Sequence, residues 1–390
     1  MLASLFSRRK ALAVLGALAL SACAPVAMTG GGGAAPELVA GAPVPVALLV
    51  PAGSPDPADG LIARSMENAA RLAIADLSGV AVDLRVYPTA SSPAQAGQAA
   101  RQAVADGAAV ILGPLRQEEA NAAAVAVAGT GVNVLAFTNN TTIAGGNLFV
   151  LGPTFQNTAE RLARYARSAG VSSFAVAYGS DPAGTLGRDA IVAAVNTAGG
   201  TVPLAQAYPL SQQGIAGAAP AILQAAQGAG AQALFTTAVP AYDLPVLAEA
   251  LTAAGHDPGT LRLVGLTRWD SVPGILAQPA LQGGLFAIPD YGMTQAFEAR
   301  YQAAYGEAPH PLAALAYDGI AAVGALALRG GPQALGRASL TQGQGFEGTA
   351  GIFRLLPDGT NQRGLAVATV QNNQVVILDP APRSFRGAGL

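Results

Sequence analysis

Residues 44–51 read VPVALLVP, a run of seven apolar residues (44–50) that ends at Pro51-Ala52-Gly53. A strand without alternating polar residues is typical of a parallel sheet that is covered on both faces. Residues 61–77 follow with apolar positions at helical spacing. The folded part of the chain therefore begins as strand, loop and helix, and the rest of the sequence decides whether that unit repeats.

The unit does repeat along the chain. Strands are predicted at 80–87, 108–112, 132–136, 173–178, 201–208, 233–237, 262–265 and 285–288. Helices are predicted at 93–105, 117–128, 157–170, 186–197, 215–227, 244–254, 294–305 and 311–328. The last strands, 348–355, 365–371 and 374–378, have only turns between them. This order predicts an α/β fold of two lobes, each a parallel doubly wound sheet, with several crossings between the lobes.

The pattern also sets the expected boundaries and two local features. We expect residues 44–152 and 287–340 to form lobe 1, and residues 153–286 and 341–390 to form lobe 2. Asn157-Thr158-Ala159-Glu160 has the form of a capping box that opens a helix. On that helix Arg161, Arg164 and Arg167 share one face, which is predicted to be solvated, with an anion-binding patch as the alternative.

The N-terminus predicts export and anchoring. Residues 1–22 combine Arg8, Arg9 and Lys10 with an apolar stretch at 11–20, which is too short to span a bilayer and is typical of a secretory signal. Leu20-Ser21-Ala22-Cys23 resembles the lipobox of bacterial lipoproteins, which implies a lipidated Cys23. Ordinary cleavage and an uncleaved anchor are the alternatives. Residues 24–43 contain four consecutive glycines and predict a flexible tether. Ala24 favours the periplasmic side of the outer membrane over the inner membrane, because an Asp there marks inner-membrane retention in enteric-type sorting.

Composition excludes several chemistries. Lys10 is the only lysine, so the mature chain has none for a P-loop or a pyridoxal Schiff base. One Cys and two His are too few for a zinc cluster or a disulfide framework. Loss of Arg8, Arg9 and Lys10 lowers the net charge by three from −2 to −5, which argues against nucleic acid.

Catalytic motifs are not recognised either. The glycines at 343, 345 and 348 have Gly-x-Gly-x-x-Gly spacing, but a Pro-Asp-Gly turn follows within ten residues where a nucleotide-binding helix would be needed. His256 and His310 lie in loops without a nucleophile that the sequence would pair with them. We therefore expect a protein without enzyme activity, metal or cofactor.

A ligand cleft is expected where the strands end, because open parallel sheets bind ligands beyond the carboxyl ends of their strands. The candidate cleft residues are Arg116, Gln117, Thr138, Asn139, Tyr178, Ser180, Asp181, Thr237, Arg268 and Trp269. Arg116 and Arg268 are interpreted either as bidentate carboxylate ligands or as rim residues. Trp269 is interpreted either as a stacking platform or as a core residue.

The order of these segments resembles the type I periplasmic binding-protein fold in its leucine/isoleucine/valine-receptor branch, over residues 44–378. The resemblance is carried by VALLVP at 46–51, MENAA at 66–70, VILGP at 110–114 and NVLA at 133–136, with the first crossing at 149–153. It implies loops that bind an amino acid's carboxylate through hydroxyls and its ammonium through an acid. Arg116 departs from that pattern, since amino-acid receptors usually have small hydroxyl residues there.

Within this fold, several short segments are similar to the lipoprotein activators of penicillin-binding proteins. They are GPL at 113–115, VNVLA at 132–136, LGR at 186–188, GGTV at 199–202, GFEGTAG at 345–351, Arg363 and QVV at 374–376. The similarity implies contact with a penicillin-binding protein and regulation of peptidoglycan synthesis. The enteric activators carry a large helical domain before the fold, whereas this chain has only the tether. The alternative is the substrate-binding lipoprotein of an amino-acid or amide ABC importer, with an ABC permease as partner.

Overall fold

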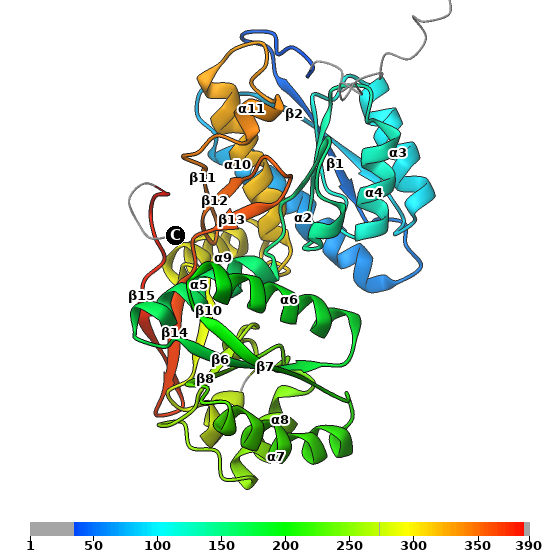
Figure 1. Cartoon of the computed structure of the whole chain (residues 1–390). Coiled ribbons are helices and arrows are strands. Elements are labelled where there is room, and N and C mark those ends of the chain that lie inside the picture. The colour runs from blue at the N-terminus through cyan, green and yellow to red at the C-terminus, as the bar shows by residue number, and fades with distance from the viewer. Residues whose placement is uncertain (1–34, 273, 386–390) are drawn as a thin grey trace, which may run out of the picture. The chain divides into compact units, whose positions relative to one another are not determined.

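The computed structural model describes residues 35–272 and 274–385, and it confirms the two-lobed α/β architecture (Figure 1). The first sheet has the order β2-β1-β3-β4-β5, and all of its neighbours are parallel. Its strands and helices are β1 (Val44–Val50), β2 (Val82–Pro88), β3 (Val110–Leu112), β4 (Asn133–Ala136), β5 (Leu148–Val150), α2 (Pro57–Asp76), α3 (Pro93–Ala105) and α4 (Gln117–Ala126).

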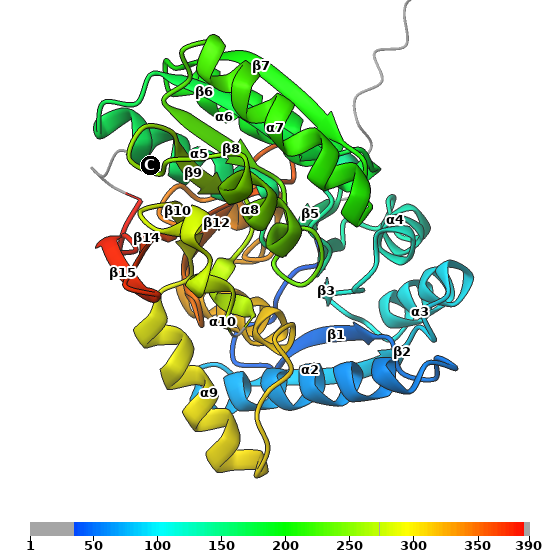
Figure 2. The ribbon, with the colours of Figure 1, turned by 90° about the horizontal axis from the view of Figure 1, so that it is seen from below.

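Strand β1 is central because its side chains enter two different cores. Val46 and Leu48 lie in the core that includes residues of α2, which runs alongside β1 (Figure 2). Ala47 and Leu49 lie in the core formed with α3 and α4 on the other face. All four side chains are at most 1% exposed, which explains why the strand shows no polar alternation.

The second sheet has the order β15-β14-β10-β9-β8-β6-β7. Five neighbouring strands of this sheet are parallel, namely β7, β6, β8, β9 and β10. Strands β14 and β15 add an antiparallel hairpin at the β10 side. The elements of this lobe are β6 (Ser173–Gly179), β7 (Thr201–Tyr208), β8 (Ala233–Thr236), β9 (Arg262–Gly265), β10 (Leu285–Ile288), β14 (Ala366–Gln371), β15 (Gln374–Asp379), α5 (Phe155–Ser168), α6 (Pro182–Thr197), α7 (Gln212–Gly228) and α8 (Leu244–Ala253). Asn372 and Asn373 join the hairpin with positive φ angles of 51° and 64°, as the predicted turn requires.

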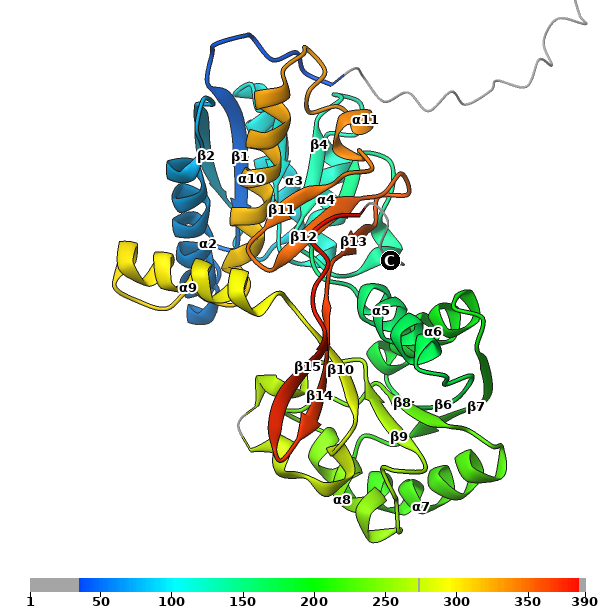
Figure 3. The same cartoon turned by 90° about the vertical axis from the view of Figure 1, so that its left-hand side faces the viewer.

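The remaining elements pack against the first lobe. They are α9 (Tyr291–Tyr305), α10 (Ala313–Arg329), α11 (Arg337–Leu340), β11 (Phe346–Gly348), β12 (Gly351–Leu355) and β13 (Asn361–Arg363). Strands β11, β12 and β13 form a small antiparallel sheet beside α10 (Figure 3). Phe346, Phe353 and Leu355 of this sheet lie in the same core as β1. The prediction that residues 341–390 belong to lobe 2 therefore does not hold for this sheet. Conversely, residues 287 and 288 end β10 of the second sheet rather than opening a lobe 1 segment.

Hydrogen bonds tie the crossings between the two lobes together. The chain crosses after β5, after β10 and after β13. The Asn361 side chain donates to the carbonyls of Val150 and Gly152, both at 2.8 Å. Arg363 donates to the Leu151 carbonyl at 2.5 Å and pairs with Asp318 of α10 at 3.3 Å. The third crossing is thus bonded directly to the first.

Two predictions for α5 are wrong. The N-cap is Thr154, whose hydroxyl accepts from the Asn157 amide, while the Asn157 side chain accepts from the Thr154 amide. The helix begins near the crossing, and Asn157 lies in its first turn instead of before it. Arg161 is 8% exposed and donates to the Leu365 carbonyl and to Asp379, so this face is not solvated.

We predict that Asn361→Ala lowers the free energy of unfolding by roughly 2 to 4 kcal/mol, because two buried carbonyls lose their donor. Urea unfolding followed by circular dichroism measures the change. Asn196→Ala, at an exposed position on α6, is the control and is expected to change stability by at most about 0.5 kcal/mol. Equal stabilities of the two variants would contradict the role given to Asn361.

Candidate functional site

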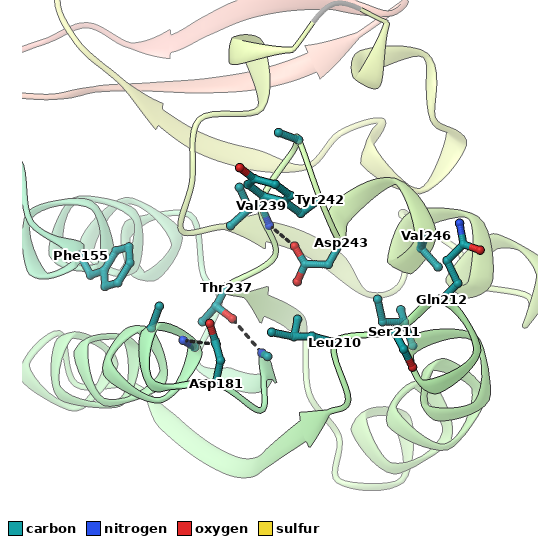
Figure 4. Close-up of a pocket in the computed structure, with 15 residues that line it drawn as sticks. Phe155, Asp181, Leu210, Ser211, Gln212, Thr237, Val239, Tyr242, Asp243 and Val246 are labelled. Carbon is teal, nitrogen blue, oxygen red and sulfur yellow. Dashed lines mark hydrogen bonds between the residues drawn. The ribbon is translucent and has the colours of Figure 1, made fainter. Parts of the chain in front are cut away.

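A pocket of about 620 Å³ lies at the carboxyl ends of β6, β7 and β8 (Figure 4). Its walls come from the loops that follow these strands and from the first residues of α5, α6 and α7. The lining residues are Phe155, Gly179, Asp181, Ala183, Gly184, Leu210, Ser211, Gln212, Ile215, Thr237, Val239, Ala241, Tyr242, Asp243 and Val246. The pocket therefore occupies the edge of a parallel sheet at which ligands are expected. We call it the sheet-edge pocket.

Asp181 and Thr237 are two predicted cleft residues that the fold brings to this pocket. Asp181 caps α6, and one of its oxygens accepts from the Gly184 amide at 2.7 Å. The Thr237 hydroxyl oxygen accepts from the Gly179 amide at 3.1 Å. The second Asp181 oxygen has no donor among the described residues. The Thr237 hydroxyl also interacts with the buried Tyr208 hydroxyl. Asp181 thus offers a negative charge to a ligand, and Thr237 lies beside it in the wall.

Asp243 is a second acid of the pocket, but its bonds are directed inward. It is 7% exposed and accepts from the Tyr208 hydroxyl at 2.7 Å and from the Val239 amide at 2.6 Å. Burial, and then the adjacent Asp243 carboxylate, raise the pKa of Tyr208 above its usual range, so the phenol stays protonated and donates. Asp243 accordingly holds the loop after β8 in place and adds negative charge beneath the pocket.

Two aromatic side chains complete the walls. Tyr242 is 79% exposed on the loop between β8 and α8, and half-buried Phe155 is the first residue of α5 (Figure 4). An exposed aromatic ring beside a pocket gives apolar area to a ligand at little cost in conformational entropy. Sequence reasoning missed both residues. The sequence did contain a signal for Tyr242. The residue lies a few positions after β8, in a loop that contains proline and no glycine.

At the edge of the first sheet, Arg116 is engaged within its own lobe. Its guanidinium lies 2.6 Å from the Asp59 carboxylate and also donates to the Ser91 hydroxyl, which donates to Asp59 at 2.6 Å. Asp59 is 2% exposed. Burial alone would raise the pKa of Asp59, but hydrogen bonds from Arg116, Ser91 and Ser54 outweigh it and lower the pKa to about 2. The charge of Arg116 is thus neutralised by a buried partner.

The other predicted residues of the first lobe lie at the start of α4 and in the loop after β4. Gln117 accepts from the Asn140 side chain, and the buried Thr138 accepts from the Asn140 amide at 3.1 Å. Asn139 is exposed and lines a second pocket of about 410 Å³, to which α5 and α6 of the other lobe also contribute. This pocket joins loops of both lobes, as the predicted cleft would.

The remaining predicted residues are not among those that line the sheet-edge pocket. Tyr178 carries the Arg188 guanidinium over its ring at 5.1 Å, and Ser180 is exposed. Arg268 is paired with Asp270 at 2.6 Å. Trp269 is fully buried and stacks on Phe286 at 5.3 Å in the second-lobe core, so the interpretation as a ligand platform is wrong. Gly265 and Gly284 leave room for its ring, because a Cβ at either position would lie within 3 Å of it.

Over residues 35–272 and 274–385, no group of His, Cys, Asp or Glu side chains is arranged to hold a metal ion. Within the same residues, no helix is both long and apolar enough to cross a bilayer. Cys23 and most of the predicted tether lie outside the described residues.

Comparison with known proteins gives a family. A family model described as periplasmic binding protein matches residues 43–374. No curated protein sequence matches significantly. Among solved structures, a protein assigned to a branched-chain amino acid ABC transporter of Rhodospirillum rubrum is 21% identical, with a TM-score of 0.72 over 86% of this chain and 100% of that one.

Two further structures contain ligands. An ABC transporter substrate-binding protein from Desulfitobacterium hafniense in complex with Leu is 18% identical, with a TM-score of 0.61 over 86% of this chain and 100% of that one. A solute binding protein of an ABC transporter from Rhodopseudomonas palustris, in complex with 3,4-dihydroxybenzoic acid, is 19% identical, with a TM-score of 0.56 over 87% and 98%. At these identities the likeness shows the fold, and the two ligands differ in kind.

The ion pair at the first sheet's edge predicts a pH effect. Because the pKa of Asp59 is about 2 in the folded chain and near 3.8 ordinarily, its stabilisation is complete above pH 4 and is lost as the pH falls toward 2. Asp59→Asn should therefore unfold more easily than the wild type by roughly 2 kcal/mol near neutral pH, and this gap should shrink between pH 4 and 2. Urea unfolding at several pH values measures it.

Asp83→Asn is the control, because Asp83 pairs with Arg85 at an exposed site and should contribute at most about 1 kcal/mol. A gap for Asp59→Asn that stays constant from pH 6 to 2 would mean that the Asp59 carboxylate does not titrate as described.

Proposed function

The chain belongs to the periplasmic binding protein family, and we propose that it is the substrate-binding protein of an ABC importer for amino-acid-like ligands. Membership of the family implies a periplasmic location. The observation that carries the proposal is the sheet-edge pocket, in which Asp181 offers a free carboxylate oxygen. An ABC permease is the partner that this function requires.

Charge argues for a ligand with an ammonium group. The sheet-edge pocket is lined by two acids, Asp181 and Asp243, and by no Arg, Lys or His. Arg116 and Arg268, the cations first considered for a carboxylate, each have a carboxylate partner of their own. A ligand that brought only a carboxylate to this pocket would be repelled, whereas an ammonium group beside Asp181 would be stabilised. The aromatic and aliphatic walls suit an apolar side chain.

The activator interpretation has less support. Its segments serve the fold itself: in the 113–115 segment, Gly113 has φ +83° and a Cβ there would lie 2.3 Å from the Leu49 carbonyl. In the 345–351 segment, a Cβ on Gly345 would likewise lie too close to Phe353, and a Cβ on Gly348 too close to Asp318. The solved structures described above are binding proteins of ABC transporters. Binding to a purified penicillin-binding protein is therefore the alternative result that the ligand-binding experiment must distinguish.

A lipid anchor at Cys23 remains part of the proposal. The first described contacts of the chain are with the segment that follows α10, where the Leu38 amide donates to the Pro332 carbonyl at 3.2 Å and Gln333 donates to the Ala35 carbonyl at 3.1 Å. We propose that the tether joins the folded chain here, at the edge of the first sheet opposite the strands' carboxyl ends. The outer membrane is the proposed site of anchoring.

We predict that an amino acid or amino-acid amide raises the melting temperature in a screen that also contains hydroxybenzoates, since a ligand at a hundred times its Kd stabilises by about 2.7 kcal/mol. Asp181→Asn keeps the cap of α6 but removes the charge, so the Kd of that ligand should rise at least about tenfold with the free protein's stability unchanged. Isothermal titration calorimetry measures the Kd.

Glu249→Gln is the matched control, because Glu249 is an exposed acid on α8 and lines neither the sheet-edge pocket nor the pocket between the lobes. Stabilisation by hydroxybenzoates alone would refute the ammonium proposal. A chain that binds a purified penicillin-binding protein and none of the small molecules would favour the activator instead.

A further inference from the structure

A separate cavity of about 310 Å³ lies where the chain crosses between the lobes. All three crossings contribute to its walls, together with the start of α10, the end of β9 and the small antiparallel sheet. We call it the crossing cavity. It is lined by Pro153, Thr154, Phe155, Thr158, Leu266, Thr267, Arg268, Ala287, Pro289, Pro311, Leu312, Ala314, Leu315, Asp318, Ala350, Ile352, Arg363 and Leu365.

The walls of this cavity resist collapse. Pro153, Pro289 and Pro311 come from three separate segments, and the ring of a proline fixes its φ angle. Thr154 is fixed by its reciprocal hydrogen bonds with Asn157, whose side chain in turn donates to the Asn361 carbonyl at 2.9 Å. Side chains in an ordinary core can shift to close a void, but here the surrounding backbone is held. The space is therefore a feature of the fold.

The charged groups that reach the crossing cavity are already compensated. Asp318, 1% exposed, pairs with Arg363 at 3.3 Å and accepts from the Thr349 amide and hydroxyl. Arg268 pairs with Asp270 at 2.6 Å. Most of the other lining side chains are apolar. A charged ligand would meet no free counter-charge and would lose its hydration, whereas an uncharged one would bury apolar surface.

We propose that the crossing cavity is a second binding site, for a small, uncharged and mainly apolar molecule. Its volume equals that of roughly ten water molecules in the liquid, which suits a single aromatic ring or a branched aliphatic chain with one polar group. The site is distinct from the sheet-edge pocket in place and in charge, and it does not depend on the function proposed for that pocket.

Phe155 connects the two sites, because its ring lines both the sheet-edge pocket and the crossing cavity. It is also part of the pocket between the lobes. An occupant of the crossing cavity would pack against Phe155. Because the crossings join the two lobes, the same occupant contacts both of them.

Binding of 4-fluorobenzyl alcohol, followed by broadening of its fluorine NMR signal, tests the proposal on the full chain. Ala314→Phe places a ring in the crossing cavity and should raise the Kd of the probe at least about tenfold. Ala241→Phe fills only the sheet-edge pocket and should leave the Kd unchanged. Melting curves of both variants show that each is folded.

Three results would overturn the proposal: no binding to the wild type, equal binding to all three proteins, or loss of binding only in Ala241→Phe. If Ala314→Phe does not fold, Leu315→Ala enlarges the cavity instead. The longer probe 3-(4-fluorophenyl)propan-1-ol should then bind this variant at least several-fold more tightly than the wild type. An unchanged Kd for the longer probe would equally refute the site.

Discussion

The bonds of Asn361 and Arg363 to the first crossing are the constraint on which both proposed sites depend. These two side chains join the carbonyls of Val150, Leu151 and Gly152 to Asp318 on α10. They are 5% and 8% exposed, so the bonds form in a region from which water is largely excluded and where an unpaired partner is costly. Since α5 begins four residues after Leu151, the same bonds position Phe155 and the α5 wall of the sheet-edge pocket.

Much of the fold was predictable because local signals and tertiary packing agree. Residues 44–50 are apolar throughout since both faces of β1 are covered, and β7 and β10 have the bounds that their sequence pattern predicts. The lobe assignment of residues 346–363 was not predictable in this way. Those strands have the same pattern whichever core they join, and only contacts such as Phe353 in the first core decide it. The buried position of Arg161 has the same cause, because its partners Leu365 and Asp379 are some two hundred residues away in sequence.

In the candidate site too, the sequence predicted where residues lie but not which residues they contact. Asp181 and Thr237 lie at the edge of the second sheet, where the rule for parallel sheets places them, and their contact with a ligand stays a prediction. The rule could not reveal that Arg116 has Asp59 as a buried counter-ion, because nothing in a single sequence relates residue 116 to residue 59. The sequence could not decide between the two interpretations of Trp269 for a related reason. It follows a strand, but Gly265 and Gly284 open a space for its ring inside the core, and only the folded chain brings them together.

The pairing of charges also separates the two pockets chemically. In the crossing cavity each Arg has a carboxylate within 3.3 Å, so the electrostatic field there is largely cancelled. In the sheet-edge pocket Asp181 and Asp243 have hydrogen-bond donors but no cation among the lining residues, so the negative charge is stabilised without being neutralised. We propose that one pocket selects by charge and the other by shape, and Phe155 lines both of them.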